Sequence, residues 1–288
     1  MTSPAELAPL ARRIWRRLEP LHAITYFAPE SHAALEAVGM KGFWMGYFAA
    51  RSAAMGAASP NLIIATFYNF HPSLVHRAVP DCWSITTPAA VLKARSSGMT
   101  DALERLALDV TTLEPLARTM ADAAVEQLAG RPLFSAHADL AWPEQAGAMQ
   151  AWWAATLIRE HRGDGHVAAL VEADIAPCEA LVLQSTYTAI PRQTLQLTRN
   201  WSDDEWQAAT ESLVARGWVD AEGGATDRGR EGLAAVERRT DELAARPVLM
   251  IGTDAATALA EAALPVAQAV MAAGAVPTIT PMFADDEL

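Results

Sequence analysis

The segment with the clearest structural pattern in this chain is TRNWSDDEWQAATESLVARGWVDAEGGATDRGREGL, residues 198–233. Ser202 is a helix-capping residue, and Glu205 follows three positions later, which is the spacing of a capping box. The segment therefore predicts a helix from Asp203 to Arg216. Apolar residues recur along it at the spacing of one helix face, namely Trp206, Ala209, Leu213 and Val214.

A short β-hairpin is predicted directly after this helix. The pair Trp218-Val219 favours a strand, and the glycine-rich residues 222–224 supply a tight turn that tolerates positive φ. Another helix is expected to begin after Thr226, and a short helix over 191–198 precedes the unit. Two helices, a wing and a further helix in this order predict a winged-helix unit with a small β-wing.

Helix start signals recur through the N-terminal half of the chain. A capping residue followed by proline occurs at Ser3-Pro4, Ser59-Pro60 and Thr87-Pro88, and proline is favoured in the first turn of a helix. Gly39 and Gly130 are typical of residues that follow a helix. Helices are predicted near 4–27, 29–38, 42–55, 60–69, 72–79, 88–107, 112–129, 143–161, 166–174, 176–186 and 254–273.

The predicted fold class is therefore mainly α, with a multi-helical N-terminal region and a winged-helix unit toward the C-terminus. Residues 1–141 form the predicted helical domain, 142–250 the winged-helix domain, and 251–288 a C-terminal helix and tail. The segment 131–142 is predicted to be an irregular connector. The last residues, 277–288, are predicted to be frayed and acidic.

Composition limits the classes of protein that fit. Of the 288 residues, 51% are hydrophobic and 19% are charged, which is enough for a sizeable core. No run of about 18 or more apolar residues occurs, so no membrane span is expected. The N-terminus lacks the pattern of a signal peptide. The two cysteines, Cys82 and Cys178, exclude a disulfide framework and favour a reducing cytoplasm.

Charge opposes DNA binding by the predicted winged helix. The whole chain carries a net charge of −12, and residues 191–246 carry eight arginines, no lysine and eleven carboxylates, a net −3. The helix 203–216 holds four carboxylates and Arg216 alone as a cation. Because non-specific DNA affinity comes from cations that neutralise phosphates, DNA remains a possible partner that the acidic charge disfavours.

The densest polar cluster in the chain is REHRGDGH, residues 159–166, between the apolar runs AWWAATLI and VAALV. Gly163 and Gly165 are expected to let the backbone turn sharply and to bring three titratable groups together. Those groups, the predicted acid-base residues, are His161, Asp164 and His166. Ligand contacts are expected from Arg159, Glu160 and Arg162.

The same cluster has a second interpretation that the sequence leaves open. A helix–helix corner also accounts for it, with Arg159 paired to Glu160 and Asp164 capping the helix that begins at His166. In the second interpretation these residues have a structural role only.

Two further clusters are candidates for parts of a ligand site. His22 and Tyr26 are four residues apart on one helix face, and Glu30 follows at the next helix, so the three are predicted to form an opposing wall. A buried structural role for His22 is the alternative. Tyr68 and Asn69 lie at a predicted helix end, where Asn69 also suits a C-cap.

Motifs for metals and common cofactors are lacking. His161 and His166 are five residues apart, which is not the spacing of a helical zinc pair, and nothing forces His22 and Glu30 to complete a site. The chain contains no P-loop, GxGxxG, GxSxG or CxxC pattern. No metal site is predicted, and no cofactor is indicated.

Several segments together resemble a known family. These segments are EPLHAITYFAPES, FYNFHPSLV, GRPLFSAHADLAWP, LIREHRGDGHVAAL and the predicted winged-helix segment 198–233. They are similar to an uncharacterised actinobacterial family of helix-turn-helix proteins with the REHRGDGH signature and a MarR-like winged helix. The similarity spans about residues 10–246. It implies the fold and no particular activity.

The leading hypothesis from the sequence is a cytoplasmic, small-molecule-binding helical protein. Its ligand is expected between the N-terminal helices and the 159–166 corner, where a His/Asp group could also act as an acid-base catalyst. The alternative is a MarR-like, DNA-binding transcription regulator that forms a dimer. A homodimer is the expected assembly in either case, and the sequence identifies neither the ligand nor a reaction.

Overall fold

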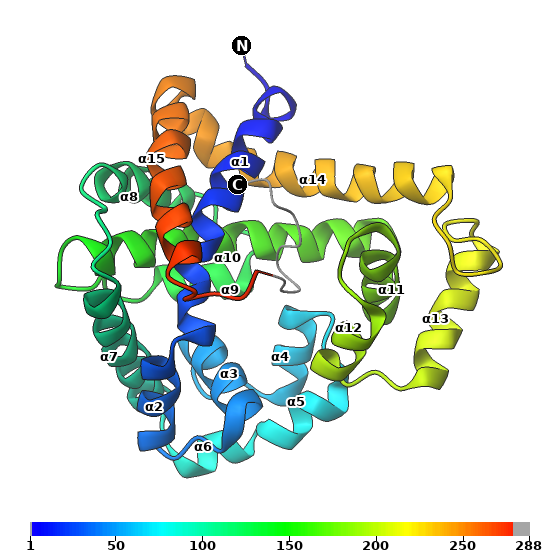
Figure 1. The fold of residues 1–288 in the computed structure, drawn as a ribbon, viewed down its shortest axis with the longest axis horizontal. Helices are drawn as coiled ribbons and strands as arrows, with labels where there is room; N and C mark the ends of the chain where they lie inside the picture. Colours follow the sequence, from blue (N-terminus) through cyan, green and yellow to red (C-terminus); the bar gives the residue numbers. More distant parts are fainter. Residues whose placement is uncertain (1, 279–288) are drawn as a thin grey trace.

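The protein is mainly helical, as predicted. The structure, a computed structural model, describes residues 2–278, and helices joined by short turns make up this part of the chain (Figure 1). The helices are α1 (Pro4–Phe27), α2 (Pro29–Ala37), α3 (Gly42–Ser52), the 3₁₀ helix η1 (Ala53–Met55), α4 (Pro60–Phe67), α5 (Pro72–Ala78), α6 (Asp81–Ile85), α7 (Pro88–Leu106), α8 (Leu113–Val125), α9 (Pro132–Ala138), α10 (Ala148–Glu172), α11 (Pro177–Tyr187), α12 (Arg192–Arg199), α13 (Asp203–Ala215), α14 (Asp227–Ile251) and α15 (Thr253–Ala272).

Capping chemistry sets many of the helix starts. Ser3 accepts a hydrogen bond from the backbone N–H of Glu6, whose carboxylate returns one to Ser3, so α1 begins with a capping box. The side chains of Ser59 and Thr87 accept a backbone N–H in the first turn of α4 and α7, respectively, and each of these residues is followed by proline. The expected positions of these starts are confirmed.

Helix α10 is the centre of the molecule. It packs against α1, α8, α9 and α14, and Figure 1 shows it running through the middle of the fold with α1 crossing it. Its apolar residues join those of α1, α8, α14 and α15 in one large core. A second core lies among α2 to α7, and a third among α11 to α13 and the ends of α10 and α14.

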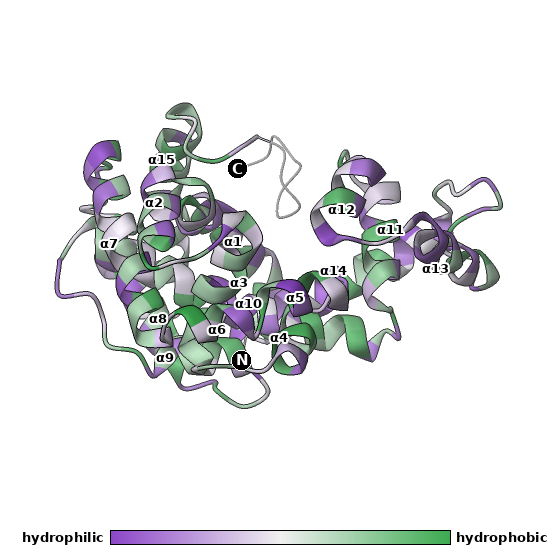
Figure 2. Ribbon diagram, turned by 90° about the horizontal axis from the view of Figure 1, so that it is seen from below, coloured by the Kyte–Doolittle hydropathy of each residue, from purple (hydrophilic) through white to green (hydrophobic). Residues whose placement is uncertain are grey.

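The fold is elongated along α10 and α14. Figure 2 shows α11, α12 and α13 at one end of the molecule and α7, α8 and α9 at the other, with α10 and α14 reaching between them. The predicted division at 141/142 and 250/251 stays a prediction. The predicted frayed tail falls almost wholly on residues 279–288, outside the described part.

In the part of the chain that the structure describes, α15 is the one helix whose length and apolar composition would allow it to span a membrane. Its buried residues form one stripe, and that stripe packs against α1 and α8. The members of the stripe are Ala256, Leu259, Ala260, Ala263, Val266, Ala267 and Val270. This spacing of three and four is that of a core helix with one buried face.

The predicted β-wing is wrong. Between Trp218 and Thr226 the structure has one isolated antiparallel bridge, Val219 to Ala225, and no strand is assigned within residues 2–278. The carboxylate of Asp220 accepts hydrogen bonds from the backbone of Glu222 (3.0 Å) and Gly224 (2.6 Å) and holds a tight turn. Thr226 then caps α14, so no residues are left to extend a second strand.

The region between α8 and α10 also differs from the prediction. Residues 131–142 were expected to be irregular, but Pro132 begins the short helix α9. Helix α10 begins at Ala148 rather than Pro143.

The end of α4 also differs from the prediction. This helix ends at Phe67, and its C-cap residue is Tyr68 and not Asn69. Tyr68 adopts φ 60°, which is uncommon for a residue with a side chain.

Candidate functional site

The predicted corner at 159–166 is wrong, because these residues form the middle of α10. Gly163 and Gly165 take helical backbone angles, since neither is among the described residues with positive φ. A glycine inside a helix costs about 1 kcal/mol relative to alanine. Burial of α10 against α1, α8 and α14 outweighs that cost, and the helix continues to Glu172.

A continuous helix sends its polar side chains to different neighbours. His161 and Asp164 both face α9, where the Phe134 ring lies 5.1 Å from the His161 ring and the Phe134 N–H donates to Asp164 Oδ2 at 2.8 Å. His166 instead lies against α14, with its Nδ1 3.0 Å from Thr240 Oγ1. The structure therefore brings two of the three predicted acid-base residues to one face and places the third elsewhere.

Burial changes the protonation of these groups. It lowers the pKa of His161 to about 3, with help from the Arg131 charge, so His161 is neutral near pH 7. Burial also raises the pKa of Asp164 to about 6, against the opposing Phe134 N–H. His161 Nε2 has no hydrogen-bond partner in the described residues. The pair packs against α9 and does not face the cavity described below.

Arg162 joins α10 to α14 and α1. Its Nη2 lies 2.8 Å from Asp241 Oδ1, its guanidinium covers the Trp15 ring at 3.9 Å, and Arg12 pairs with the other oxygen of Asp241 at 2.6 Å. These contacts are ion pairs and ring packing between three helices. They give Arg162 a structural role.

Glu160 is the most strongly bound carboxylate of the cluster. Its side chain is 1% exposed, and it accepts from Arg51 Nη2 at 3.1 Å and from Arg159 Nη1 at 2.6 Å. Burial alone would raise the pKa of Glu160, but the charges of Arg159 and Arg51 outweigh it and hold that pKa well below its usual value. Arg159 also lies 3.6 Å from Glu19 on α1, so α1, α3 and α10 meet at these ion pairs.

His22 and Tyr26 meet as predicted from their spacing. His22 Nε2 lies 2.8 Å from the Tyr26 hydroxyl, and its Nδ1 lies 3.0 Å from Thr156 Oγ1 on α10. Burial and then the Arg159 charge lower the pKa of His22 well below its usual value, so His22 is neutral. His22 is fully buried and both of its ring nitrogens are engaged within the core.

The remaining predicted residues lie apart from this pair. Glu30 is at the surface, where it pairs with Arg105 of α7. The Tyr68 hydroxyl donates to the Ile175 carbonyl, and the Asn69 carbonyl accepts from Trp201 Nε1 at 2.9 Å. Tyr68 and Asn69 thus attach the α4–α5 turn to the unit formed by α11 to α13.

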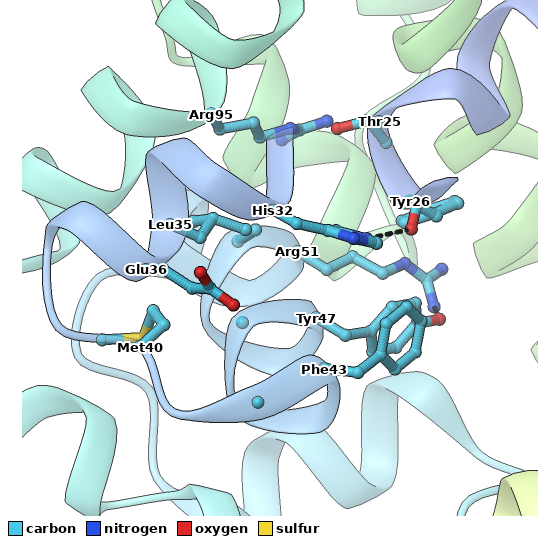
Figure 3. A pocket seen from close by; sticks show the side chains of 13 residues that line it. Thr25, Tyr26, His32, Leu35, Glu36, Met40, Phe43, Tyr47, Arg51 and Arg95 are labelled. Atoms are coloured by element: carbon cyan, nitrogen blue, oxygen red, sulfur yellow. Dashed lines mark hydrogen bonds between the residues drawn. The ribbon is translucent and has the colours of Figure 1, made fainter. Parts of the chain in front are cut away.

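A cavity of about 100 Å³ lies between α1, α2, α3 and α7, and it contains Tyr26 but none of the other predicted residues. Figure 3 shows its lining, with Arg95 and Thr25 on one side and Phe43 and Tyr47 on the other. The Phe43 and Tyr47 rings stack at 6.0 Å. The lining residues are Thr25, Tyr26, His32, Leu35, Glu36, Met40, Gly42, Phe43, Gly46, Tyr47, Ala50, Arg51 and Arg95.

The cavity holds polar groups that the sequence did not reveal. Arg51 (9% exposed) and Arg95 (4% exposed) both line it. Arg95 Nη1 donates to His137 Nε2 at 3.0 Å, and His137 Nδ1 lies 2.8 Å from the Leu133 carbonyl. These bonds fix the His137 proton on Nδ1. Burial and the Arg95 charge lower the pKa of His137 to about 4, so it is neutral.

The signal that could have found these residues is an isolated arginine within an apolar helix face. Arg51 lies in GYFAARSAAM and Arg95 in AAVLKARSSGM, and neither has a charged residue three or four positions away. Arginine is rarely buried unless it has a partner. His32, four residues before Glu36 on α2, was missed because one histidine beside one acid is a common surface pair.

Comparison with known proteins gives the family. The chain matches the helix-turn-helix family over residues 11–277, and it belongs to that family. No curated protein and no solved structure matches the chain. Within residues 2–278, no group of three or more His, Cys, Asp or Glu side chains is placed to hold a metal ion.

Proposed function

We propose that this protein binds a small organic molecule in the cavity between α1, α2, α3 and α7. The observation that carries the proposal is the lining itself, which combines an aromatic and apolar wall with two buried guanidiniums, Arg51 and Arg95. Ligand pockets commonly pair an apolar wall with a few polar groups that orient the ligand.

The size of the cavity indicates the size of the ligand. An engineered apolar cavity of about 150 Å³ binds benzene. A cavity of about 100 Å³ with Phe43 43% exposed at its edge fits a single-ring molecule that reaches partly into solvent. We propose binding alone, and assign no reaction, because the buried histidines His22, His137 and His161 are neutral and held by the core.

A plugging variant tests this function. Ala50 lines the cavity, so Ala50→Leu fills part of it, whereas Ala37→Leu changes an exposed position on α2. The assay is a thermal-shift screen with phenol, benzyl alcohol, benzamide and benzoate at millimolar concentration. We expect at least one of these to raise the unfolding temperature of wild type and of Ala37→Leu, and not of Ala50→Leu. Shifts that persist in Ala50→Leu, or their absence in wild type, would refute the proposal.

The second candidate is a DNA-binding regulator with a helix-turn-helix unit, and the family description favours it. Helices α11, α12 and α13 are connected by short turns, and α13 would be the recognition helix. The exposed residues of α13 oppose this function, because they include Asp203, Asp204 and Glu211 and no cation. A band-shift assay with random duplex DNA at low salt tests it, and absence of any shift would exclude it.

The cellular setting and assembly are also proposals. Cys82 and Cys178 are free and buried, which suits a reducing cytoplasm. A homodimer is proposed because two-fold symmetric dimers are the commonest assembly among soluble oligomers. Size-exclusion chromatography with light scattering tests the dimer, and a monomer mass would contradict it.

A further inference from the structure

Arg95 has an unusual environment for a buried cation. Its side chain is 4% exposed, its hydrogen bond goes to neutral His137, and its guanidinium lies 5.1 Å from the Trp152 ring. Among the described residues, no ion pair joins a carboxylate to Arg95, and Arg95 lines the cavity. An unpaired buried charge is strongly destabilising, so the fold alone does not account for an arginine at this position.

The neighbouring carboxylates, Glu160 and Glu19, already lie beside other partners, although Glu19 Oε1 accepts no hydrogen bond. Glu160 binds Arg51 and Arg159, and Glu19 accepts from Trp15 Nε1 at 2.7 Å with Arg159 3.6 Å away. Three largely buried guanidiniums, those of Arg51, Arg95 and Arg159, therefore face two carboxylates. Counted without Glu36, an exposed carboxylate of α2 that also lines the cavity, this buried cluster carries an excess of one positive charge, and the excess lies beside the cavity.

The excess charge persists near pH 7. Burial lowers the pKa of Arg95, yet a guanidinium starts from a value so high that it stays protonated in proteins. Burial also raises the pKa of Glu19, which weakens the negative side of the balance further. A bound anion would supply the missing charge.

A carboxylate suits the site better than a phosphate. An arginine fork binds a carboxylate through two parallel hydrogen bonds, and a carboxylate carries the single charge that the balance lacks. Phosphate monoesters carry nearly two negative charges near pH 7. Phe43, Tyr47 and Met40 offer the opposite side of the cavity to an apolar body.

We infer that the ligand is an organic carboxylate, anchored by Arg95 through its carboxylate group, with an apolar ring or chain against Phe43 and Tyr47. The inference rests on the proposed function and names the class of its ligand. Arg95 is the residue that recognises the anion, and His137 positions Arg95 by accepting its hydrogen bond. Arg51 stays bound to Glu160 and contributes through its charge.

The experiment compares benzoate with benzamide, which has nearly the same shape and no charge, by calorimetric titration of the full chain. We expect wild type to bind benzoate about tenfold or more tightly than benzamide. Arg95→Met keeps the packing on Trp152 and removes the charge, and it is expected to lose that preference. Arg105→Met removes an exposed arginine from the same helix and is the matched control, with the preference unchanged.

The outcomes separate the inference from the proposed function. Equal affinity for benzoate and benzamide in wild type, both lost in Ala50→Leu, would leave the cavity a binding site and overturn the carboxylate inference. Inorganic phosphate that competes with benzoate and binds more tightly would overturn it as well. Binding of neither benzoate nor benzamide would overturn the carboxylate inference, and the proposed function falls with it if phenol and benzyl alcohol also fail to bind. The wild-type comparison needs no variant, so it stands even where Arg95→Met folds poorly.

Discussion

The substitution Glu160→Gln tests the ion-pair cluster at the centre of the fold. It keeps the shape of the side chain and removes the charge that Arg51 and Arg159 share. The amide nitrogen cannot accept the hydrogen bonds that one carboxylate oxygen accepts at 3.1 Å and 2.6 Å. Removing one partner of a buried ion pair costs roughly 3–5 kcal/mol, because the remaining charge has no counterion.

That loss is large against the stability of an ordinary protein, which is about 5–15 kcal/mol. We therefore expect urea unfolding, followed by circular dichroism at pH 7, to show a fall of at least about 3 kcal/mol for Glu160→Gln. The control is Glu242→Gln, whose carboxylate is 23% exposed and lies 3.5 Å from Arg239 at the surface, with an expected change below about 1 kcal/mol. The sign of the pH effect follows from the low pKa of Glu160. Its stabilisation is present above the unfolded pKa and is lost as pH falls toward the folded one. A loss for Glu160→Gln no larger than that of Glu242→Gln would refute the buried-pair argument.

Three further substitutions probe helix continuity, packing and pH dependence, each measured by urea unfolding. Gly163→Ala should stabilise the protein by about 0.5–1 kcal/mol, because alanine favours a helix and its Cβ would lie at an ordinary 3.5 Å from Arg159 Nη1. Destabilisation by this variant would contradict a continuous α10. Gly98→Ala should destabilise the protein by about 1–3 kcal/mol, because its Cβ would lie 2.7 Å from the Ser31 Cα where α7 packs on α2. An unchanged midpoint of urea unfolding would show that the two helices can separate. His161→Phe should reduce the loss of stability on acidification. The folded pKa of His161, about 3, lies below the unfolded value. Its contribution to the free energy of unfolding is therefore complete above about pH 6.5 and falls by about 1.4 kcal/mol per pH unit below that. Equal acid sensitivity in wild type and variant would argue against a buried neutral histidine.

The helix positions could be predicted from the sequence because their signals are local. A capping serine or threonine followed by proline stands at the start of α1, α4 and α7, and these starts lie where they were predicted. The absence of the β-wing could not be predicted, because a glycine-rich turn is compatible with both a hairpin and a single bridge. Which of the two forms depends on Asp220, whose carboxylate accepts hydrogen bonds from the turn, and on how soon α14 begins after Thr226.

The candidate site could not be predicted from local pattern, because its members come from distant segments. The string REHRGDGH suggested a turn, since glycine and polar residues usually mark loops. The same residues suit a buried helix surrounded on several sides, where Glu160 meets Arg51 of α3 and Arg162 meets Asp241 of α14. Which neighbour each side chain meets is decided by tertiary packing. Two contacts between neighbours in the sequence could be predicted beforehand: His22 with Tyr26, four residues apart on one helix, and Arg159 with Glu160.

The distribution of charge favours a function inside the molecule over one on the α13 surface. The chain carries a net charge of −12, and the exposed side of α13 is acidic, so a phosphate backbone is repelled there. The buried cluster beside the cavity has the opposite sign, because Glu160 and Glu19 do not balance Arg51, Arg95 and Arg159. Charges buried in a low-dielectric interior are screened far less than surface charges, so this small excess attracts an anion more strongly than exposed charges of the same size would. An organic anion small enough to enter the cavity therefore fits the electrostatics of this protein better than a nucleic acid does.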